Sequence, residues 1–361
     1  MRKLIIFFGK LFFLFKSKKK TKEPKRILIM RSGGIGDVLM STPLVKAIRK
    51  HYPKAKITYF VGNWSKNSLE NNPNIDRIFN YDDLIIIKRN IIKISGLIKK
   101  IRKEKFDLGF NLEKSWHWAV LMFLFGIPKR IGFDRKGEGF ANNLTVPFNG
   151  TKYELEYYLD LARLLKMKIP TDEMEIYLTN KEKIIANKFI KQSKLKNKKK
   201  IGIAPGGADN PAQQAFIKRW PLENYIRLID KLTGKKKYVI LFGGENDIEI
   251  CKEIIKKIKN KNQVLNTAGK FTVKSCAAVM KKCNLFVTHD SGPMHIAAAV
   301  KVPLIALFGP TQSRRFAPKD AIIIKNKICR PCYDIYGNYK KCEKKDCMKV
   351  IEVNDVLKAI K

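Results

Sequence analysis

The sequence lacks an apolar run long enough to cross a membrane. A spanning helix needs about 20 apolar residues, whereas the N-terminal run ends at Phe15 and is interrupted by Lys10. No small-residue cleavage site follows, as a secretory signal would require. We therefore expect a protein of the cytosolic, reducing compartment.

Acidic residues are scarce. The chain has 32 Asp and Glu against 74 Lys and Arg, a formal net charge of +42. Such charge attracts nucleic acid, anionic lipid or phosphorylated substrates, but Lys codons in an AT-rich genome would also produce it. Aromatic residues are not interleaved with the basic runs, and no nucleic-acid motif is present. We expect no nucleic-acid partner, although a basic nucleic-acid-binding protein remains a remote alternative.

Two nucleotide-binding motifs and one type of metal site are also missing. The chain has neither G-x-G-x-x-G, which argues against a nicotinamide-dependent oxidoreductase, nor a phosphate-binding loop ending in Gly-Lys-Ser/Thr. No group of carboxylates has metal-site spacing. The sequence therefore offers no candidate site for a catalytic metal or another cofactor.

What the chain does contain is a regular alternation of strand and helix patterns. Strands are predicted at 26–30, 56–61, 77–80, 107–111, 200–204, 238–242, 284–288 and 303–308. Helices are predicted at 42–50, 87–101, 115–125, 153–166, 222–232, 247–258, 273–282 and 292–299. This order predicts an α/β protein with two doubly wound, Rossmann-like domains.

The length of the chain also favours two domains. We expect an apolar and basic segment at 1–25, an N-terminal domain at 26–175 and a C-terminal domain at 176–361, with the linker inside 169–180. Ligands of such sheets bind at the carboxyl ends of the strands, so two facing sheets would form a central cleft.

The first predicted loop, Arg31–Asp37, carries four small residues and one acid. Ser32, Gly33, Gly34 and Gly36 would let the backbone approach a ligand closely. Asp37 would suit a base that takes the proton of a hydroxyl group. Alternatively, it is only a favourable charge at a helix N-terminus.

Loops of the second half suit a phosphorylated ligand. Backbone N–H groups at Gly206 and Gly207, with the side chains of Lys218 and Arg219, are what a diphosphate needs; an ordinary turn with surface charges is the alternative. Glu245 follows another strand, where a carboxylate can accept ribose hydroxyl hydrogen bonds.

A fourth loop joins a strand to a helix. Ser291 and Gly292 would place free N–H groups at the helix start, which is an anion site. Asp290 can equally be a helix N-cap, and His295 can simply be a residue packed in the protein interior. Thr311 ends a fifth loop, which we expect at the same sheet edge.

Seven cysteines fall into two groups. Cys251, Cys276 and Cys283 lie in or beside apolar helical stretches and are predicted to be small core residues. The segment 329–347 holds the other four: Cys329, Cys332, Cys342 and Cys347. These thiols would hold a structural zinc ion, or they are free or form a disulfide.

The N-terminal segment predicts an in-plane membrane anchor. The apolar side chains expected to enter the interface are Phe7, Phe8, Leu11, Phe12, Phe13 and Phe15, followed by the basic residues Lys16, Lys18, Lys19 and Lys20. A disordered or cleaved leader is the alternative. The basic face between Lys93 and Lys103 is a second candidate for contact with anionic lipid.

Five motifs together resemble glycosyltransferase family 9, the ADP-heptose:lipopolysaccharide heptosyltransferases. The residues that carry the resemblance are 27–37, 218–221, 242–245, 289–295 and 307–311, and it extends from Arg26 to the C-terminus. It implies a GT-B fold, with the acceptor bound by the first domain and the donor by the second, and an inverting transfer that needs no metal.

The resemblance also implies roles for individual residues. Asp37 matches the general base and Lys218 the basic residue at the donor phosphates, while Glu245 matches a ribose contact. The remaining donor-loop matches are Asp290, Ser291, Gly292, His295 and Thr311.

The implied function is transfer of a heptose, or a similar sugar, from a nucleotide-sugar donor to a lipopolysaccharide core or lipid-linked glycan. The implied location is the inner face of the cytoplasmic membrane, at an anionic surface. The inserted-looking segment Asp209–Ala215 is longer than in many relatives. It leaves open a family 9 transferase with another nucleotide-sugar donor.

Overall fold

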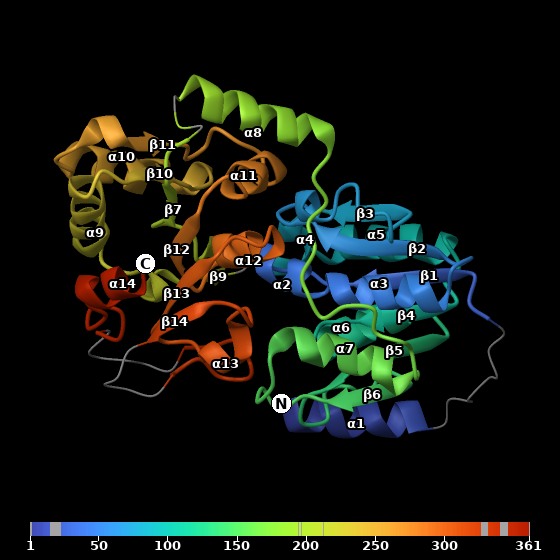
Figure 1. The fold of residues 1–361 in the computed structure, drawn as a ribbon. Helices are drawn as coiled ribbons and strands as arrows, with labels where there is room; N and C mark the ends of the chain where they lie inside the picture. Colours follow the sequence, from blue (N-terminus) through green and yellow to red (C-terminus); the bar gives the residue numbers. More distant parts are fainter. Residues whose placement is uncertain are drawn as a thin grey trace. The chain divides into compact units, whose positions relative to one another are not determined.

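The structure, a computed structural model, describes residues 2–14, 23–193, 195, 197–211, 213–325, 331–339 and 346–360. The chain forms two compact units, Met1–Glu173 and Met174–Lys361, and each is described by itself (Figure 1). The division falls inside the stretch 169–180, in which a helix begins only at Asn180.

The first unit is built on one six-stranded parallel sheet. Its strands are β1 (Arg26–Met30), β2 (Lys56–Gly62), β3 (Arg77–Tyr81), β4 (Leu108–Asn111), β5 (Lys129–Asp134) and β6 (Leu144–Pro147). Their order is β3-β2-β1-β4-β5-β6, which is the order of a doubly wound Rossmann sheet. Because β1 is central, four of its five residues are buried, as its continuous apolar run predicts.

Helices cover both faces of this sheet. They are α2 (Ile35–Met40), α3 (Thr42–His51), α4 (Asp83–Ile87), α5 (Ile91–Lys103), α6 (Trp116–Leu124) and α7 (Glu154–Leu164), with the 3-10 turn η1 (Lys66–Ser68). Leu97 of α5 and Met122 of α6 pack with Phe60 of β2 in one core cluster. Helices α2 and α3 pack against α7.

Two predictions for this unit were wrong in detail. The helix predicted over 87–101 is interrupted, because Arg89 adopts a positive φ of 51° and the side chain of Asn90 caps a new helix. The predicted loop Arg31–Asp37 ends at Gly34, and α2 begins at Ile35. Asp37 therefore lies in the first turn of a helix.

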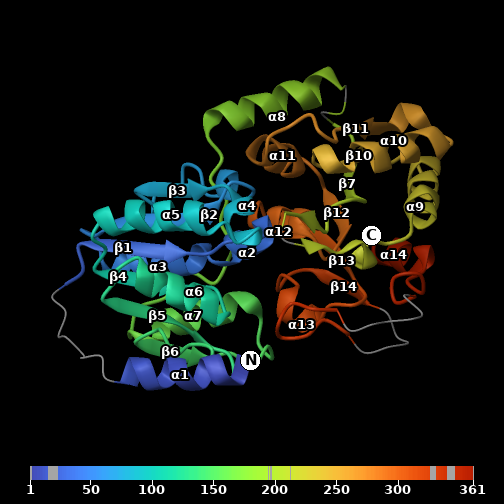
Figure 2. The ribbon, with the colours of Figure 1, turned by 180° about the vertical axis from the view of Figure 1, so that it is seen from behind.

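The N-terminal helix α1 (Arg2–Leu14) lies beside β6 in both views of the ribbon (Figures 1 and 2). The ring of Phe13 packs against Phe123 and Phe140, with centroids 4.9 and 5.9 Å apart, and Arg2 pairs with Glu138 at 2.9 Å. The expectation that Phe13 enters a membrane interface was therefore wrong. Phe15 and the basic residues Lys16, Lys18, Lys19 and Lys20 lie outside the described residues, and so does the side chain of Phe12.

The second unit repeats the topology. Its parallel strands are β7 (Lys200–Ala204), β10 (Tyr238–Leu241), β11 (Val264–Asn266), β12 (Leu285–His289), β13 (Leu304–Phe308) and β14 (Ile322–Lys325). Their order, β11-β10-β7-β12-β13-β14, is again that of a Rossmann sheet. A short hairpin, β8 (Asp209–Asn210) and β9 (Gln213–Gln214), occupies the inserted-looking segment.

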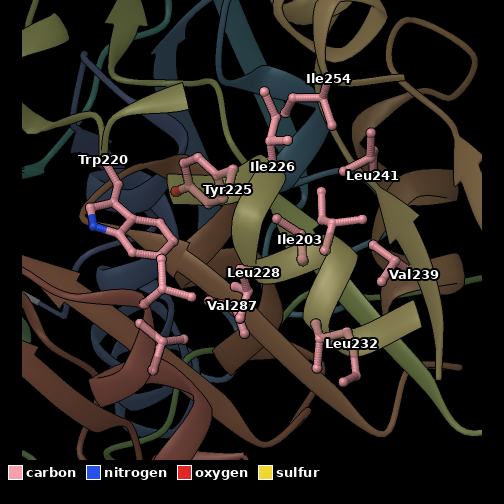
Figure 3. Packing of buried hydrophobic residues seen from close by; sticks show 14 of the residues in the cluster. Ile203, Trp220, Tyr225, Ile226, Leu228, Leu232, Val239, Leu241, Ile254 and Val287 are labelled. Carbon is pink, nitrogen blue, oxygen red and sulfur yellow. The ribbon is translucent and has the colours of Figure 1, made fainter. Parts of the chain in front are cut away.

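The helices of this unit are α8 (Asn180–Gln192), α9 (Leu222–Gly234), α10 (Ile248–Lys257), α11 (Val273–Met280), α12 (Gly292–Ala299), α13 (Ser313–Phe316) and α14 (Val353–Ala359), with the 3-10 turns η2 (Phe216–Lys218), η3 (Glu245–Asp247) and η4 (Lys261–Gln263). Trp220 is buried in a core cluster with Tyr225 of α9 and residues of the central strands (Figure 3). Its indole N–H donates to the Ile351 carbonyl at 2.9 Å. This anchor fixes the preceding residues, Lys218 and Arg219.

Cysteine burial follows the prediction for two of the three scattered residues. Cys251 and Cys283 are buried, and Cys276 is half-buried. Burial raises the pKa of each of these thiols to about 12. Within the part of the chain that the structure describes, no helix is both long and apolar enough to cross a membrane.

Candidate active site

Both sheets have a topological switch point, where the strand order reverses. It lies between β1 and β4 in the first unit and between β7 and β12 in the second. Ligands of doubly wound proteins bind outside the carboxyl ends of strands at this point. The predicted loops around Asp37, Gly207 and Asp290 follow three of these four strands.

In the first unit, the loop after β1 is fixed by an acid that follows β4. Glu113 accepts hydrogen bonds from the backbone N–H and the hydroxyl of Ser32, each at 2.7 Å. Gly33 has a φ of 102°, a conformation that favours glycine, and its carbonyl accepts the hydroxyl of Ser65. The loop is therefore held from two neighbouring strands.

Arg31 joins this loop to Asp37. Its guanidinium lies 2.8 Å from the Asp37 carboxylate and 2.6 Å from Glu113, and its Nε donates to the Tyr158 hydroxyl at 3.0 Å. Burial alone would lower the pKa of Arg31, but the neighbouring Asp37 and Glu113 carboxylates raise it well above its usual value. Arg31 is a fixed positive charge that orients two carboxylates.

A second buried pair lies beside this group. Lys114 pairs with the almost fully buried Glu154, and its ammonium is 5.0 Å from the centroid of the Tyr158 ring. Burial lowers the pKa of Lys114, with Arg31 adding to the effect and Glu154 opposing it. The same burial raises the pKa of Tyr158. Tyr158 is a neutral hydroxyl that links the two ion pairs.

The chemistry of this first site centres on Asp37. Its side chain is 31% exposed, whereas those of Arg31 and Glu113 are about one-tenth exposed. The Asp37 carboxylate is thus accessible to a ligand, and Arg31 holds it in place. It can therefore accept a proton from a bound hydroxyl group. Ser32 and Gly34 are half-buried beside it, and Gly36 is buried inside α2.

In the second unit, one carboxylate holds three segments together. Asp247 accepts the N–H groups of Gly207 at 2.7 Å and Gly244 at 3.0 Å, and it lies 3.6 Å from the Arg219 guanidinium. Arg219 also donates to the Gly207 carbonyl at 3.0 Å. Gly207 has a φ of 81°, which favours glycine. The sequence interpretation missed Asp247, which lies only two residues after the predicted Glu245.

Lys218 and Asp290 form the central ion pair of this site. Their charged atoms are 3.0 Å apart, and Asp290 is buried. Burial alone would raise the pKa of Asp290, but the neighbouring Lys218 ammonium outweighs it, so the pKa is lowered. The Lys218 ammonium is also 5.7 Å from the centroid of the Tyr333 ring. Asp290 thus orients the ammonium in a nearly dry environment.

The helix α12 begins at Gly292, directly after this pair. Ser291 occupies the N-cap position without a side-chain cap hydrogen bond, and a Cβ atom on Gly207 would lie 3.2 Å from the Ser291 side chain. Asp290 is therefore not the N-cap. The glycine loop and the start of α12 adjoin at the switch point, where backbone N–H groups can bind an anion.

Two histidines lie behind this loop. His289 ends β12, and its Nδ1 is 3.1 Å from the hydroxyl of Tyr225. Burial lowers the pKa of His289 to about 3, so the ring is neutral at neutral pH. His295 is buried in α12. Its burial agrees with a packed side chain, and it lies near enough to Asp290 to help lower the pKa of that carboxyl. Its place among the donor-loop residues stays a prediction.

The predicted site residues of the second unit come together at one sheet edge. Gly206 and Gly207 follow β7, Asp290 to Gly292 follow β12, and Thr311 follows β13. Glu245 is exposed in the turn after β10. Beside it, Asn246 donates to Asp209 of the inserted hairpin at 3.2 Å.

The cysteine-rich segment is only partly described. Cys329 and Cys342 lie outside the described residues. The backbone N–H groups of Cys332 and Tyr333 donate to the Pro310 carbonyl at 2.9 and 3.1 Å, so this segment packs on the loop that carries Thr311. Among the described residues, no group of three or more His, Cys, Asp or Glu has the arrangement of a metal site.

A carboxylate loop on one Rossmann-like unit and a cationic, glycine-rich loop on the other fit a glycosyltransferase that uses a nucleotide sugar. The sequence matches the family model of glycosyltransferase family 9 (heptosyltransferase) over residues 94–349. The chain belongs to this family and is a glycosyltransferase.

Characterised relatives agree with the match. The chain is 29% identical over 311 residues to lipopolysaccharide heptosyltransferase 2 of Escherichia coli, covering 81% of this chain and 85% of the relative. It is 25% identical over 346 residues to lipooligosaccharide heptosyltransferase 2 of Campylobacter jejuni, covering 93% and 98%.

Solved structures share the fold. The family 9 glycosyl transferase of Veillonella parvula superposes with a TM-score of 0.75 at 25% identity, covering 93% of this chain and 95% of that one. The ADP-heptose heptosyltransferase II of Escherichia coli superposes with a TM-score of 0.72 at 24% identity, covering 93% of this chain and 97% of that one. The prediction of two Rossmann-like, GT-B type domains is confirmed.

Proposed function

We propose that this glycosyltransferase transfers a heptose from ADP-heptose to a lipopolysaccharide core or a similar lipid-linked glycan. The names of the relatives in Escherichia coli and Campylobacter jejuni support this choice of sugar and acceptor. The observation that carries it in the chain is the second switch point. There the Lys218–Asp290 pair, Arg219 and the start of α12 surround the place where a diphosphate would bind.

In the proposed reaction, the acceptor hydroxyl oxygen attacks the anomeric carbon of the donor sugar. The new carbon–oxygen bond forms as the bond to the diphosphate breaks, so the configuration inverts. Asp37 takes the hydroxyl proton, while Arg31 keeps its carboxylate in one orientation. The products are the glycoside and ADP, and Asp37 then releases the proton to solvent, which restores its carboxylate.

The departing diphosphate requires positive charge at the point where its own charge increases. Lys218 can donate a hydrogen bond to the phosphate while it stays paired with Asp290, since an ammonium has three donors. The Arg219 guanidinium adds a second positive charge at the diphosphate. The N–H groups at Ser291 and Gly292 add the partial positive charge of a helix start. We propose that these groups replace the divalent ion that some other transferases use.

A family 9 transferase with another nucleotide-sugar donor is the second candidate. The specific observation in its favour is the hairpin β8–β9, which the Asn246–Asp209 hydrogen bond holds beside Glu245. A group of the donor that extends beyond Glu245 would contact this hairpin. The sugar or the base that the site prefers can therefore differ from that of the relatives.

We further propose that the enzyme works at the anionic inner face of the cytoplasmic membrane, attached in part through α1. With Phe13 turned toward Phe123, the opposite side of α1 exposes Leu4, Phe7, Phe8 and Leu11. Phe7 and Phe8 are 63% and 62% exposed. Aromatic side chains on an amphipathic helix of this kind favour the lipid interface.

Release of ADP from ADP-heptose in the presence of a deacylated, soluble core acceptor tests the function. A panel with UDP- and GDP-sugars and other ADP-sugars serves as the comparison. We expect turnover with ADP-heptose well above that with any other donor. A higher kcat/KM for a different nucleotide sugar would support the second candidate, and no release with any donor would refute both.

A further inference from the structure

The corner between α4 and α5 exposes large apolar side chains. Ile91 and Ile92, the first two residues of α5, are 80% and 84% exposed, more than the exposed aromatic residues of α1. Leu84 and Ile87 of α4 are 45% and 41% exposed beside them in the chain. Adjacent isoleucines at such exposure are costly in water. They make this corner a candidate interaction surface.

The chain around this corner is uniformly basic. Between Lys88 and Lys103 there are seven basic residues and no acid: Lys88, Arg89, Lys93, Lys99, Lys100, Arg102 and Lys103. In the part of the chain that the structure describes, Lys88, Arg89 and Lys93 make no ion pair. The acidic residues that flank this stretch already have other partners. Asp82 caps α4, and Glu104 pairs with Arg77 at 2.8 Å.

The corner adjoins the acceptor-side loop. In a β-α-β unit the helix begins at the carboxyl edge of the sheet, so the start of α5 lies on the edge that carries Asp37. A short series of contacts connects the two. The backbone N–H of Trp64 donates to Asp83 of α4 at 3.0 Å, and the next residue, Ser65, donates to the Gly33 carbonyl. Trp64 is itself exposed.

We propose that the α4–α5 corner is a second membrane-docking surface, in which Ile91 and Ile92 enter the interface of an anionic bilayer. Apolar insertion and positive charge are the two signals that stable attachment at a lipid surface requires. This inference rests on the proposed function, because a lipid-linked acceptor keeps its sugar beside the bilayer. Docking at the corner would present that sugar to the Ser32–Gly34 loop.

A second copy of the chain fits the corner less well. A two-fold symmetric contact would place this patch against itself. The unpaired charges of Lys88, Arg89 and Lys93 would then face their own copies at short range, which is unfavourable. Anionic lipid headgroups have the opposite charge, and the acyl chains beneath them accept the isoleucines.

The test is cosedimentation of the full-length protein with vesicles of phosphatidylcholine alone, or with an equal part of phosphatidylglycerol. The variant is Ile91→Ser/Ile92→Ser. The matched control is Ile184→Ser in α8 of the other unit, because Ile184 is 64% exposed. A third variant, Phe7→Ser/Phe8→Ser, reports on α1 separately. All of these positions are exposed, and turnover with the soluble acceptor checks that each protein is folded.

We expect the corner variant to bind the anionic vesicles about tenfold or more weakly than the wild type, with the control unchanged. Its turnover should fall on vesicle-embedded acceptor and stay normal on soluble acceptor. Unchanged vesicle binding would overturn the proposal, as would a loss of self-association in sedimentation velocity without a loss of vesicle binding. Failure of the proposed function is distinct, since it would abolish wild-type transfer to both acceptors.

Discussion

The guanidinium of Arg31 lies 2.8 Å from the carboxylate of Asp37, and the same guanidinium lies 2.6 Å from Glu113. One buried cation thus orients both the proposed base and the acid that fixes its loop. Removing the cation leaves Glu113 without its charged partner in a nearly dry place. Removing both members of the pair avoids that penalty.

We therefore expect Arg31→Gln to lower the free energy of unfolding by about 3 kcal/mol, and Arg31→Gln/Glu113→Gln to lower it by less. Urea unfolding of the wild type, Arg31→Gln, Glu113→Gln and the double variant completes a double-mutant cycle. Arg163→Gln is the control, because its ion pairs are at the surface and should contribute little. Additive losses in the double variant would show that the pair is not coupled.

Asp37→Asn should lower kcat by about a hundredfold or more, the usual scale for loss of a general base. Donor affinity should be nearly unchanged, since the donor is proposed to bind the second unit. Single-turnover kinetics and calorimetric titration with the donor separate the two effects. Glu70→Gln, an exposed acid of the same unit, serves as the control. Wild-type turnover in Asp37→Asn would remove this residue from the mechanism.

Glu245→Gln should raise the KM for the donor by about tenfold while kcat changes little. An exposed carboxylate that accepts ribose hydroxyl hydrogen bonds contributes equally to the ground state and the transition state. Steady-state kinetics with varied donor measure this. Glu249→Gln, four residues later and also exposed, should behave as the wild type. An equal fall in kcat and kcat/KM would contradict a role in ribose binding alone.

Stability should depend on pH through His289. Burial lowers the folded-state pKa to about 3, whereas the unfolded value is about 6.5. The unfolded chain therefore binds more protons between these values, so the free energy of unfolding falls as the pH drops below 6.5. At pH 5 this one group should cost about 2 kcal/mol.

Urea unfolding at pH 7 and pH 5 tests this contribution. In His289→Gln the difference between the two pH values should shrink by that amount, whatever the variant does to stability at pH 7. His51→Gln is the control, because His51 is exposed. The same pH difference in His289→Gln and the wild type would show that His289 is not held neutral in the folded protein.

Transfer should persist in excess chelator, because Lys218, Arg219 and the start of α12 are proposed to neutralise the diphosphate. The measurement is ADP release with and without chelator, with the melting temperature followed in parallel, since zinc lost from the cysteines would lower stability. Activity that disappears at an unchanged melting temperature, and returns with magnesium or manganese, would contradict this prediction.

The fold could be predicted from sequence because its central strands are continuous apolar runs. Buried strands such as Arg26–Met30 and Lys200–Ala204 have the predicted bounds. Strands β5, β6, β11 and β14 were not predicted. Three of these four have only three or four residues, and their pairing depends on neighbours in the folded sheet.

The site could be predicted only where glycine loops and charges lie close together in the chain. The loop residues and Lys218 follow this rule. Glu113, which is 82 positions from Arg31, does not, because no spacing in the sequence connects them. One signal was available, since Glu113 follows the end of a central strand. The break at Arg89 also had a signal in Asn90, but the isoleucine periodicity continues through it.

The carboxylate shared by Gly207, Gly244 and Arg219 has a consequence for engineering new donor preferences. Asp247 binds all three segments at once, so none of them can be grafted from a relative as an isolated peptide. A transplanted Pro205–Ala208 loop would lack the Asp247 carboxylate, which accepts the Gly207 N–H and fixes the loop backbone. Chimeras should instead exchange 205–247 as one cassette, with the hairpin carried along inside it.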